Sequence, residues 1–337
     1  MNRTVAALAG LLAVQLIVAA GLGFARSGLS GPAKEVPLVA LSSHKVDRIT
    51  IEGPDKAKVV LAEVKGSWQL PELADFPANQ TRVQSLVDAL GKLTEGLPVA
   101  TTRDAQTRFK VSDTDFERRV TLSAGGKAIA TVYFGTSPSM REIHARREGQ
   151  PDVYSVQFAS WQIPAKQSGW EDKTLLQIPV RDIAAIDVAG LHIVQAEDKT
   201  SGDKTSNDKT SADAKAAAKE PAWQAAGLAA GETLDPTAVA SLAGSLANLE
   251  FDHVIKGTPP ADDGLASPAL ELTVTKRGGA SVAYRIGKSK DGKTYTLKSS
   301  ARSEYFAVPS YGAEPLIAAA SRDKLLDINP ASVAAKR

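Results

Sequence analysis

Residues 118–135 read RRVTLSAGGKAIATVYFG, and residues 270–287 read LELTVTKRGGASVAYRIG. In both stretches apolar residues alternate with polar residues on either side of a Gly-Gly pair, and both stretches end in glycine. Alternation with a period of two predicts half-buried strands, and Gly-Gly favours a tight hairpin turn because glycine readily adopts positive φ. We therefore expect one antiparallel hairpin in each half of the chain.

The segments around these hairpins also recur in the same order. Each half contains a short alternating strand, a tryptophan-bearing hairpin arm, an amphipathic helix, the Gly-Gly hairpin and a further strand. This ordered recurrence predicts an internal duplication, with Trp68 and Trp223 as core residues. The matched segments are VDRITIEG (46–53) with RDIAAIDVAG (181–190), GSWQL (66–70) with PAWQA (221–225), and VYSVQFA (153–159) with YFAVPSY (305–311).

The two predicted helices place apolar residues at three- and four-residue spacing, which is the pattern of one buried face. In the second helix we expect Asp235 to cap the N-terminus and Pro236 to occupy the first helical position. Each copy is thus predicted to be an α+β domain, a mostly antiparallel sheet with one main packed helix. The apolar positions are Val83, Leu86, Val87, Leu90 and Leu93 in the first helix and Val239, Leu242, Leu246 and Leu249 in the second.

The N-terminal stretch TVAALAGLLAVQLIVAAGLGFA, Thr4 to Ala25, carries no charge. A helix of this length, at about 1.5 Å per residue, spans the roughly 30 Å core of a bilayer. The alternative is a cleaved signal peptide, because Val18-Ala19-Ala20 and Gly23-Phe24-Ala25 resemble cleavage sites. The apolar run is longer than the usual core of a signal peptide, which favours a transmembrane anchor with the rest of the chain outside the cytoplasmic membrane.

A low-complexity stretch in the second half, DKTSGDKTSNDKTS (198–211), is built from residues that cannot form a core. We therefore expect a disordered insertion at 197–220, within the first hairpin of the second copy. The predicted regions are an anchor or uncleaved signal (1–25), a flexible tether (26–45), a first α+β repeat (46–179), a second α+β repeat (180–329) and a C-terminal tail (330–337).

Composition excludes several classes of function. Lys and Arg number 40 against 38 Asp and Glu, so the net charge of +2 gives no electrostatic basis for binding nucleic acid. The chain has no cysteine, which excludes disulfides, thiolate catalysis and cysteine-based zinc sites. Hydrophobic residues at 43% and charged residues at 23% are ordinary for a globular protein.

No catalytic, cofactor-binding or metal-binding residue is predicted. The four histidines, including His144, His192 and His253, are isolated in the sequence, and none has a carboxylate or a second histidine at metal-ligand spacing. No sequence motif of a hydrolase, nucleotide-binding protein or metalloprotease is present. The acidic pairs in predicted turns, such as Asp113 with Asp115, are expected to cap backbone groups.

The densest basic cluster lies within one predicted strand and consists of Arg141, His144, Arg146 and Arg147. It is our candidate interaction surface, facing anionic lipid headgroups or an acidic partner. The alternative is an ordinary solvated hairpin arm.

In the order of these predicted elements, the chain resembles the bacterial family labelled domain of unknown function 4340. The resemblance implies a membrane-anchored envelope protein without catalytic residues, associated with ABC-type transport systems. One departure is Phe109-Lys110-Val111, which stands where the family has a Phe-Gly-Leu-like turn. The resemblance is carried by VDRITIEG, GSWQL, VQSLVDALGKL, TVYFG, DVYSV and WEDKTLLQI.

From these observations we expect a non-catalytic protein of the bacterial inner membrane, single-pass, with most of the chain periplasmic. Its role would be that of an accessory or scaffold for a membrane transport system, anchored through Thr4 to Ala25. The alternative is a periplasmic protein that binds a ligand or glycan in a cleft between the two copies, lined by Trp161 or Trp170. A hydrolase with an unrecognised site is the third hypothesis.

Overall fold

The structure, a computed structural model, describes Leu12, Gln15 and residues 36–41, 45–196, 222–259, 263–290 and 292–328. Its internal contacts divide the chain into two compact units, and each is described by itself. The first unit is Met1–Glu63 with Thr81–Ala165, and the second is Val64–Gln80 with Lys166–Arg337. Both are mixtures of antiparallel sheet and few helices, as predicted for the fold class.

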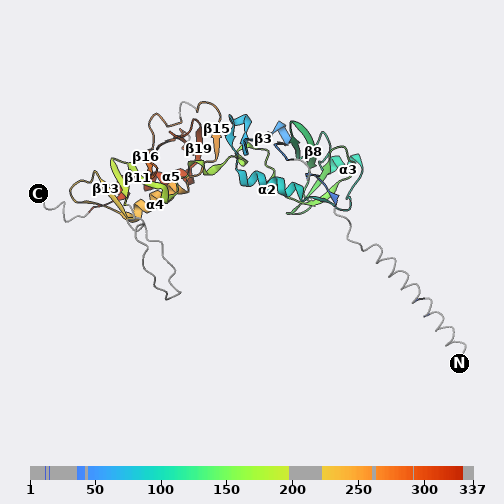
Figure 1. Ribbon diagram of the computed structural model, residues 1–337, viewed down its shortest axis with the longest axis horizontal. Helices are drawn as coiled ribbons and strands as arrows, with labels where there is room; N and C mark the ends of the chain where they lie inside the picture. Colours follow the sequence, from blue (N-terminus) through green and yellow to red (C-terminus); the bar gives the residue numbers. More distant parts are fainter. Residues whose placement is uncertain are drawn as a thin grey trace, which may run out of the picture. The chain divides into compact units, whose positions relative to one another are not determined.

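The first unit is built on an antiparallel sheet with the strand order β10-β9-β8-β7-β2-β3. Figure 1 labels β3 and β8 of this sheet. Its helices are α2 (Gln80–Gly91), α3 (Arg103–Arg108) and the short 3₁₀ helices η1 (Pro54–Lys56) and η3 (Ser160–Gln162). The strands are β2 (Arg48–Glu52), β3 (Lys58–Val64), β7 (Arg118–Ala124), β8 (Lys127–Phe134), β9 (Glu142–Arg147) and β10 (Tyr154–Gln157).

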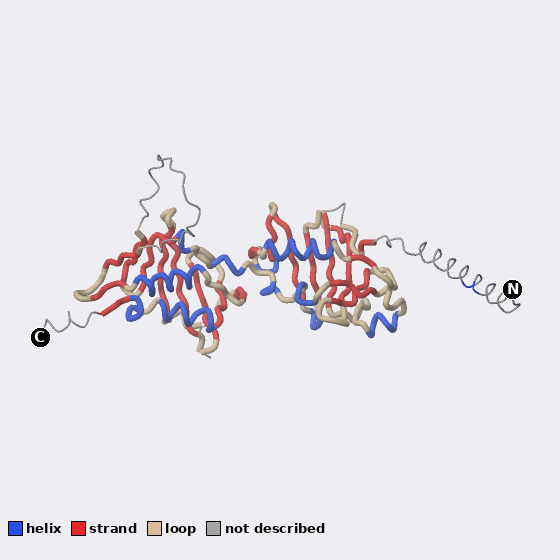
Figure 2. The backbone as a smooth tube through the Cα atoms, turned by 90° about the horizontal axis from the view of Figure 1, so that it is seen from below, coloured by secondary structure: helices blue, strands red, loops and turns tan. Residues whose placement is uncertain are grey.

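Helix α2 lies across one face of this sheet (Figure 2). Val83, Leu86 and Leu90 are buried on its inner side, as the apolar spacing predicted, and Leu93 is buried just beyond its end. On the sheet, alternate residues such as Ile49 and Ile51 are fully buried. The core of the unit therefore lies between α2 and one side of the sheet.

The predicted Gly-Gly hairpin is present in the first unit. Ala124 pairs with Lys127 across the turn, and Gly125 and Gly126 have φ angles of 58° and 77°. Two successive positive φ angles are the geometry of the hairpin turns whose twist matches that of the strands. In the second unit the corresponding hairpin pairs Thr275 with Ser281 around the Gly-Gly pair.

The prediction of a flexible tether at residues 26–45 is wrong for its second half. Strand β1 (Val36–Pro37) pairs antiparallel with β6 (Thr94–Glu95), and the N–H of Leu38 donates to the carbonyl of Leu93 at 2.8 Å. Leu38 and Val39 are 0% and 1% exposed. Residues 36–41 therefore belong to the folded first unit, because the apolar run in PLVAL finds a place beside the end of α2.

The second unit contains an eight-stranded antiparallel sheet with the order β13-β12-β11-β16-β17-β18-β19-β15. A separate pair joins β14 (Glu232–Leu234) to β20 (Leu326–Ile328). The strands of the large sheet are β11 (Ile183–Val188), β12 (Leu191–Gln195), β13 (Trp223–Ala226), β15 (His253–Ile255), β16 (Leu270–Lys276), β17 (Ser281–Lys288), β18 (Thr294–Ser299) and β19 (Tyr305–Pro309).

Helices α4 (Pro236–Ala247) and α5 (Ser310–Ala319) cover one face of this sheet (Figure 2), followed by the short α6 (Arg322–Leu325). The side chain of Asp235 accepts hydrogen bonds from the N–H groups of Thr237 and Ala238, which confirms the predicted cap. The predicted apolar face of α4 is buried. Helix α5 was not predicted, since Pro315 lies inside it and proline normally interrupts a helix. The remaining 3₁₀ helices are η2 (Pro71–Leu73), η4 (Gln167–Gly169), η5 (Lys173–Leu176) and η6 (Val180–Asp182).

The segment Val64–Gln80, with β4 (Ser67–Leu70) and β5 (Phe76–Pro77), clusters with the second unit. The ring of Phe76 stands perpendicular to that of Phe251 at 6.1 Å between centroids and lies 6.2 Å from that of Phe306. Burial of an aromatic side chain contributes strongly to stability, so this cluster accounts for the assignment. Trp68 and Trp223 are 7% and 8% exposed, as expected of core residues.

The predicted anchor, Thr4 to Ala25, lies outside the described residues apart from Leu12 and Gln15, and so do the predicted insertion at 197–220 and the tail at 330–337. Within the described part of the chain, no helix combines the length and the apolar character needed to cross a bilayer.

Candidate functional site

The face of the second sheet opposite its helices carries a row of small and polar residues. Asp187 on β11 lies opposite His192 on β12 and Thr273 on β16, and Thr273 in turn lies opposite Ala283 on β17. Their neighbours along the strands, such as Val188, are buried on the other side. Because side chains alternate between the two faces of a sheet, these four residues share the face that the helices leave uncovered.

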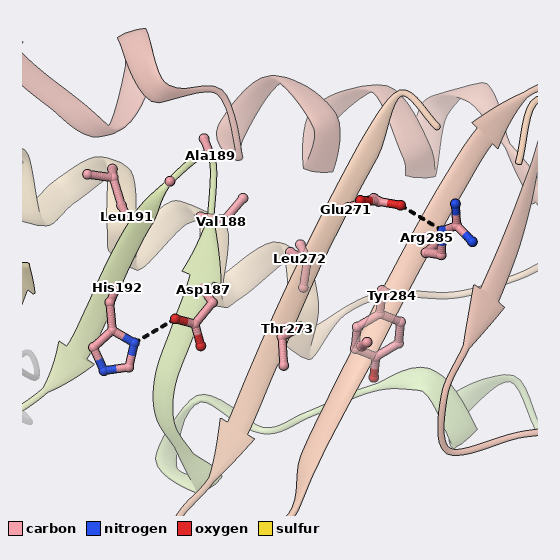
Figure 3. Close-up of a pocket in the computed structure, with 12 residues that line it drawn as sticks. Asp187, Val188, Ala189, Leu191, His192, Glu271, Leu272, Thr273, Tyr284 and Arg285 are labelled. Atoms are coloured by element: carbon pink, nitrogen blue, oxygen red, sulfur yellow. Dashed lines mark hydrogen bonds and ion pairs between the residues drawn. The ribbon is translucent and has the colours of Figure 1, made fainter. Parts of the chain in front are cut away.

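A two-residue turn brings Asp187 and His192 together. Ala189 and Gly190 have φ angles of 51° and 77°, which closes a hairpin immediately after Val188. The Oδ1 atom of Asp187 lies 2.6 Å from Nδ1 of His192, and both side chains are about half exposed (Figure 3). His192, which is isolated in the sequence, therefore has a carboxylate partner in the folded sheet. The sequence carried a signal for this pair, since the Ala-Gly turn in DVAGLH sets the two residues opposite each other.

A second ion pair lies on the same face, one step along β16 and β17. The Nε atom of Arg285 donates to Oε1 of Glu271 at 2.7 Å, and its Nη2 donates to the carbonyl of Leu265 at 3.1 Å. The two pairs flank a depression of about 580 Å³ that we call the sheet-face depression (Figure 3). It is lined by residues 187–192, 271–273 and 283–285.

Tyr284 also borders this depression, but its hydroxyl lies on the covered side of the sheet. It donates a hydrogen bond to the carbonyl of Leu176 at 3.0 Å. Burial in this surrounding raises the pKa of Tyr284 to about 12, because the low dielectric penalises the charged phenolate. The residue therefore stays neutral and contributes to the core.

The chemistry available in the sheet-face depression is that of hydrogen bonding and charge. An Asp–His pair orients an imidazole, but a hydrolytic triad also needs a nucleophile on the other ring nitrogen. Thr273 lies on the far side of Asp187 from His192 (Figure 3). Among the described residues, no group of three or more histidine and acidic side chains is arranged to hold a metal ion.

The predicted basic cluster does not form one exposed surface. Arg141 is exposed and Arg147 is half-buried, whereas His144 and Arg146 are 8% and 3% exposed. Burial does not alternate along β9, because other residues pack on both faces of the sheet at this strand. The surface interpretation is therefore wrong for His144 and Arg146.

Arg146 instead fastens the loop after α3 to the sheet. Its Nε donates to the carbonyl of Val111 at 2.6 Å, its Nη2 pairs with Asp113, and its guanidinium lies 4.6 Å from the ring centroid of Tyr133. Asp113 therefore binds a buried arginine instead of capping a turn. Beside it, the ring of His144 stacks on Phe109 at 4.1 Å.

The two tryptophans proposed to line a ligand-binding cleft differ in their exposure. Trp170 is 0% exposed and cannot line a cleft, while Trp161 is 72% exposed. His253 also has a carboxylate partner, Asp252, at 2.9 Å. His44 lies outside the described residues.

The family model described as Domain of unknown function (DUF4340) matches residues 68–268, more than half of the chain. The chain belongs to this family. The matched stretch begins in β4 and ends before β16, so the DUF4340 match includes parts of both units. A search of curated proteins found no match, and a search of solved structures found none.

The WEDK portion of the DUF4340 resemblance has a structural role in this chain. The side chain of Glu171 is 2% exposed, and it binds Lys173 at 2.8 Å and the N–H of Val254 at 3.2 Å. The backbone of Trp170 accepts a hydrogen bond from the N–H of Asn79 at 2.8 Å. This motif therefore joins the segment before η5 to β15 and to Asn79, both within the second unit.

Proposed function

We propose that this chain is a non-catalytic, membrane-anchored protein of the bacterial envelope, which binds a partner protein through the sheet-face depression of its second unit. Thr4 to Ala25 would anchor it in the inner membrane, with both units on the periplasmic side. Its partner would be a component of a membrane transport system, to which the chain serves as accessory or scaffold. The family resemblance and the uncharged N-terminal stretch support this assignment.

The proposal includes a tandem duplication of one α+β domain. The strand order β10-β9-β8-β7-β2-β3 of the first unit has the same connectivity as β19-β18-β17-β16-β11-β12 of the second. In each unit the Gly-Gly hairpin forms two adjacent central strands of its sheet, and the main helix comes before that hairpin in the sequence. An identical order of this kind is the expected product of duplication.

Two equivalent glycines support the same interpretation. A Cβ atom on Gly135 would lie 1.9 Å from the carbonyl oxygen of Phe109, and one on Gly287 would lie 2.3 Å from the carbonyl carbon of Gly264. In each unit another turn thus packs closely against a glycine that lies within one residue of the end of the second hairpin strand. The central residue of that turn is left-handed in both cases, at Lys110 (φ 54°) and Gly264 (φ 79°).

The observation that carries the docking proposal is the difference between these two sheet faces. In the first unit, Val111, Tyr133 and Val153 form a small second core on the face away from α2. In the second unit the corresponding face presents His192 and Arg285 with about half of each side chain exposed. A rigid sheet with exposed donors, acceptors and both signs of charge suits recognition of a polar protein surface.

The test is affinity purification of the full chain from detergent-solubilised membranes. The wild type is compared with Ala283→Arg, which fills the centre of the depression, and with Ser241→Arg on the exposed side of α4 as the matched control. We expect one membrane protein to be recovered with the wild type and with Ser241→Arg but lost with Ala283→Arg.

Equal recovery of that protein with Ala283→Arg would contradict docking at the depression. Recovery of no membrane protein, together with a small ligand that copurifies with the chain, would contradict the scaffold role itself. Cleavage after Ala20 or Ala25, detected by N-terminal sequencing of the mature protein, would contradict the anchor.

A further inference from the structure

A second recess lies on the second unit, away from the sheet-face depression. It has a volume of about 460 Å³ and is formed by the end of α4 with the residues that follow it, the start of α5, and Ser168, Gly169 and Lys173. We call it the Tyr311 groove, because Tyr311 lines it and is 83% exposed. Pro309 and Pro315 lie on either side of Tyr311 in the sequence and line the groove with it.

The apolar part of this groove is continuous with the core. Leu249 and Phe251 also line it, although they are only 2% and 3% exposed. An aromatic ring that is exposed beside proline rings and above core side chains offers apolar area without the cost of ordering a flexible side chain. Exposed tyrosine is enriched where proteins bind other proteins.

The start of α5 also leaves backbone groups without their usual helical partners. Pro315 has no N–H, so the carbonyl of Tyr311 does not receive the hydrogen bond that the fourth following residue normally donates. The residue preceding the helix is Pro309, and no side chain caps the first turn. These groups can exchange hydrogen bonds with the backbone of an extended chain.

The charge of the groove is negative. Glu250 is exposed at its border, and so is Asp252, whose carboxylate lies 2.9 Å from Nδ1 of His253. Lys173 is the cation among the lining residues, and its charge is already neutralised by the buried carboxylate of Glu171 at 2.8 Å. A basic ligand is therefore favoured over an acidic one.

We propose that the Tyr311 groove binds an extended, proline-containing segment of a partner protein that carries arginine or lysine. Proline-rich segments adopt the polyproline II conformation before binding, so they lose little entropy when their rings pack on tyrosine and proline. A neighbouring basic side chain would then pair with Glu250. The site is separate from the sheet-face depression, so either proposal can fail without the other.

The test is fluorescence anisotropy with the purified full chain in detergent and three labelled peptides. The first repeats the triplet Pro-Pro-Arg, the second Ala-Ala-Arg and the third Pro-Pro-Glu. We expect saturable binding of the first peptide alone. Tyr311→Ala should weaken that binding by roughly tenfold, since truncation of an aromatic anchor has effects of this order. Glu250→Lys should shift the preference toward Pro-Pro-Glu.

The matched control is Trp161→Ala, which removes another strongly exposed aromatic residue, from the first unit, and should leave binding unchanged. Because Tyr311 and Glu250 are exposed, both variants should keep the circular dichroism of the wild type. The proposal is overturned if none of the peptides binds, if Ala-Ala-Arg binds as well as Pro-Pro-Arg, or if Tyr311→Ala and Trp161→Ala bind alike.

Discussion

The carboxylate of Glu171 accepts a hydrogen bond from the backbone N–H of Val254, although 83 residues separate them in the sequence. Val254 lies on β15, the last strand at one edge of the second sheet. The same carboxylate holds the ammonium of Lys173, which also donates to the carbonyl of Asp252. Edge strands left with free N–H groups invite pairing with other chains, so Glu171 protects this edge.

Glu171→Ala should lower the free energy of unfolding by about 2–4 kcal/mol, because it leaves the N–H of Val254 without its acceptor and the ammonium of Lys173 without its carboxylate counter-charge. Urea denaturation followed by circular dichroism measures the loss. The matched control is Glu271→Ala, which removes a half-exposed pair with Arg285 and should change stability by less than about 1 kcal/mol. Equal losses in the two variants would refute the special role of Glu171.

Phe76→Ala should lower the stability of the second unit by about 3–5 kcal/mol, since it removes a ring that is 1% exposed from contact with Phe251 and Phe306. Hydrogen exchange measures where the loss occurs. Amides of β19 should lose protection, while amides of β7 in the first unit should keep it. Loss of protection in β7 alone would show that Val64–Gln80 belongs with the first unit after all.

Alkaline pH should destabilise the second unit through Tyr284. Its folded-state pKa of about 12 exceeds the ordinary value of 10.0, so the folded state holds the phenolic proton more tightly than the unfolded state does. The contribution of Tyr284 to the free energy of unfolding is complete below a pH of about 10 and is lost as the pH rises through about 12. Stability measured against pH should therefore fall less steeply in Tyr284→Phe than in the wild type across this window. Parallel curves would contradict the assignment.

Lys110→Gly should stabilise the first unit by about 0.5–1 kcal/mol, because Lys110 has a φ of 54°, a conformation that glycine adopts without strain. This substitution also restores the glycine expected at that position from the family pattern. The control is Lys127→Gly, at an exposed and extended position of β8, where glycine should cost stability. Thermal unfolding of both variants distinguishes the two effects, and destabilisation by Lys110→Gly would count against strain at this turn.

Features set by local sequence were predictable. The Gly-Gly turn of the first hairpin, the buried face of α4 and the cap at Asp235 follow from residue chemistry within a few positions. The Asp187–His192 pair belongs to the same class, since a two-residue turn fixes which residues lie opposite each other. The turn at Ala189-Gly190 is the local signal that sets this register.

Features set by distant contacts were not predictable from one sequence. Arg146 resembles any charged residue of a hairpin arm, and only the loop that carries Val111 and Asp113 makes it a buried residue. The apolar run at Leu38 and Val39 looked like part of a tether because its partner, β6, is a strand of two residues. Likewise, the contacts of Phe76 with Phe251 and Phe306 depend on how the chain folds back over more than a hundred residues.

The most direct test of the central claim is photo-crosslinking in native cells from a benzophenone amino acid placed at Thr273, in the sheet-face depression. The same group at Ser241, on the exposed side of α4, serves as the control. The account predicts that Thr273 crosslinks to one membrane protein and that Ser241 does not. Crosslinking of that protein from Ser241 alone, or no crosslink from Thr273, would contradict docking at this face.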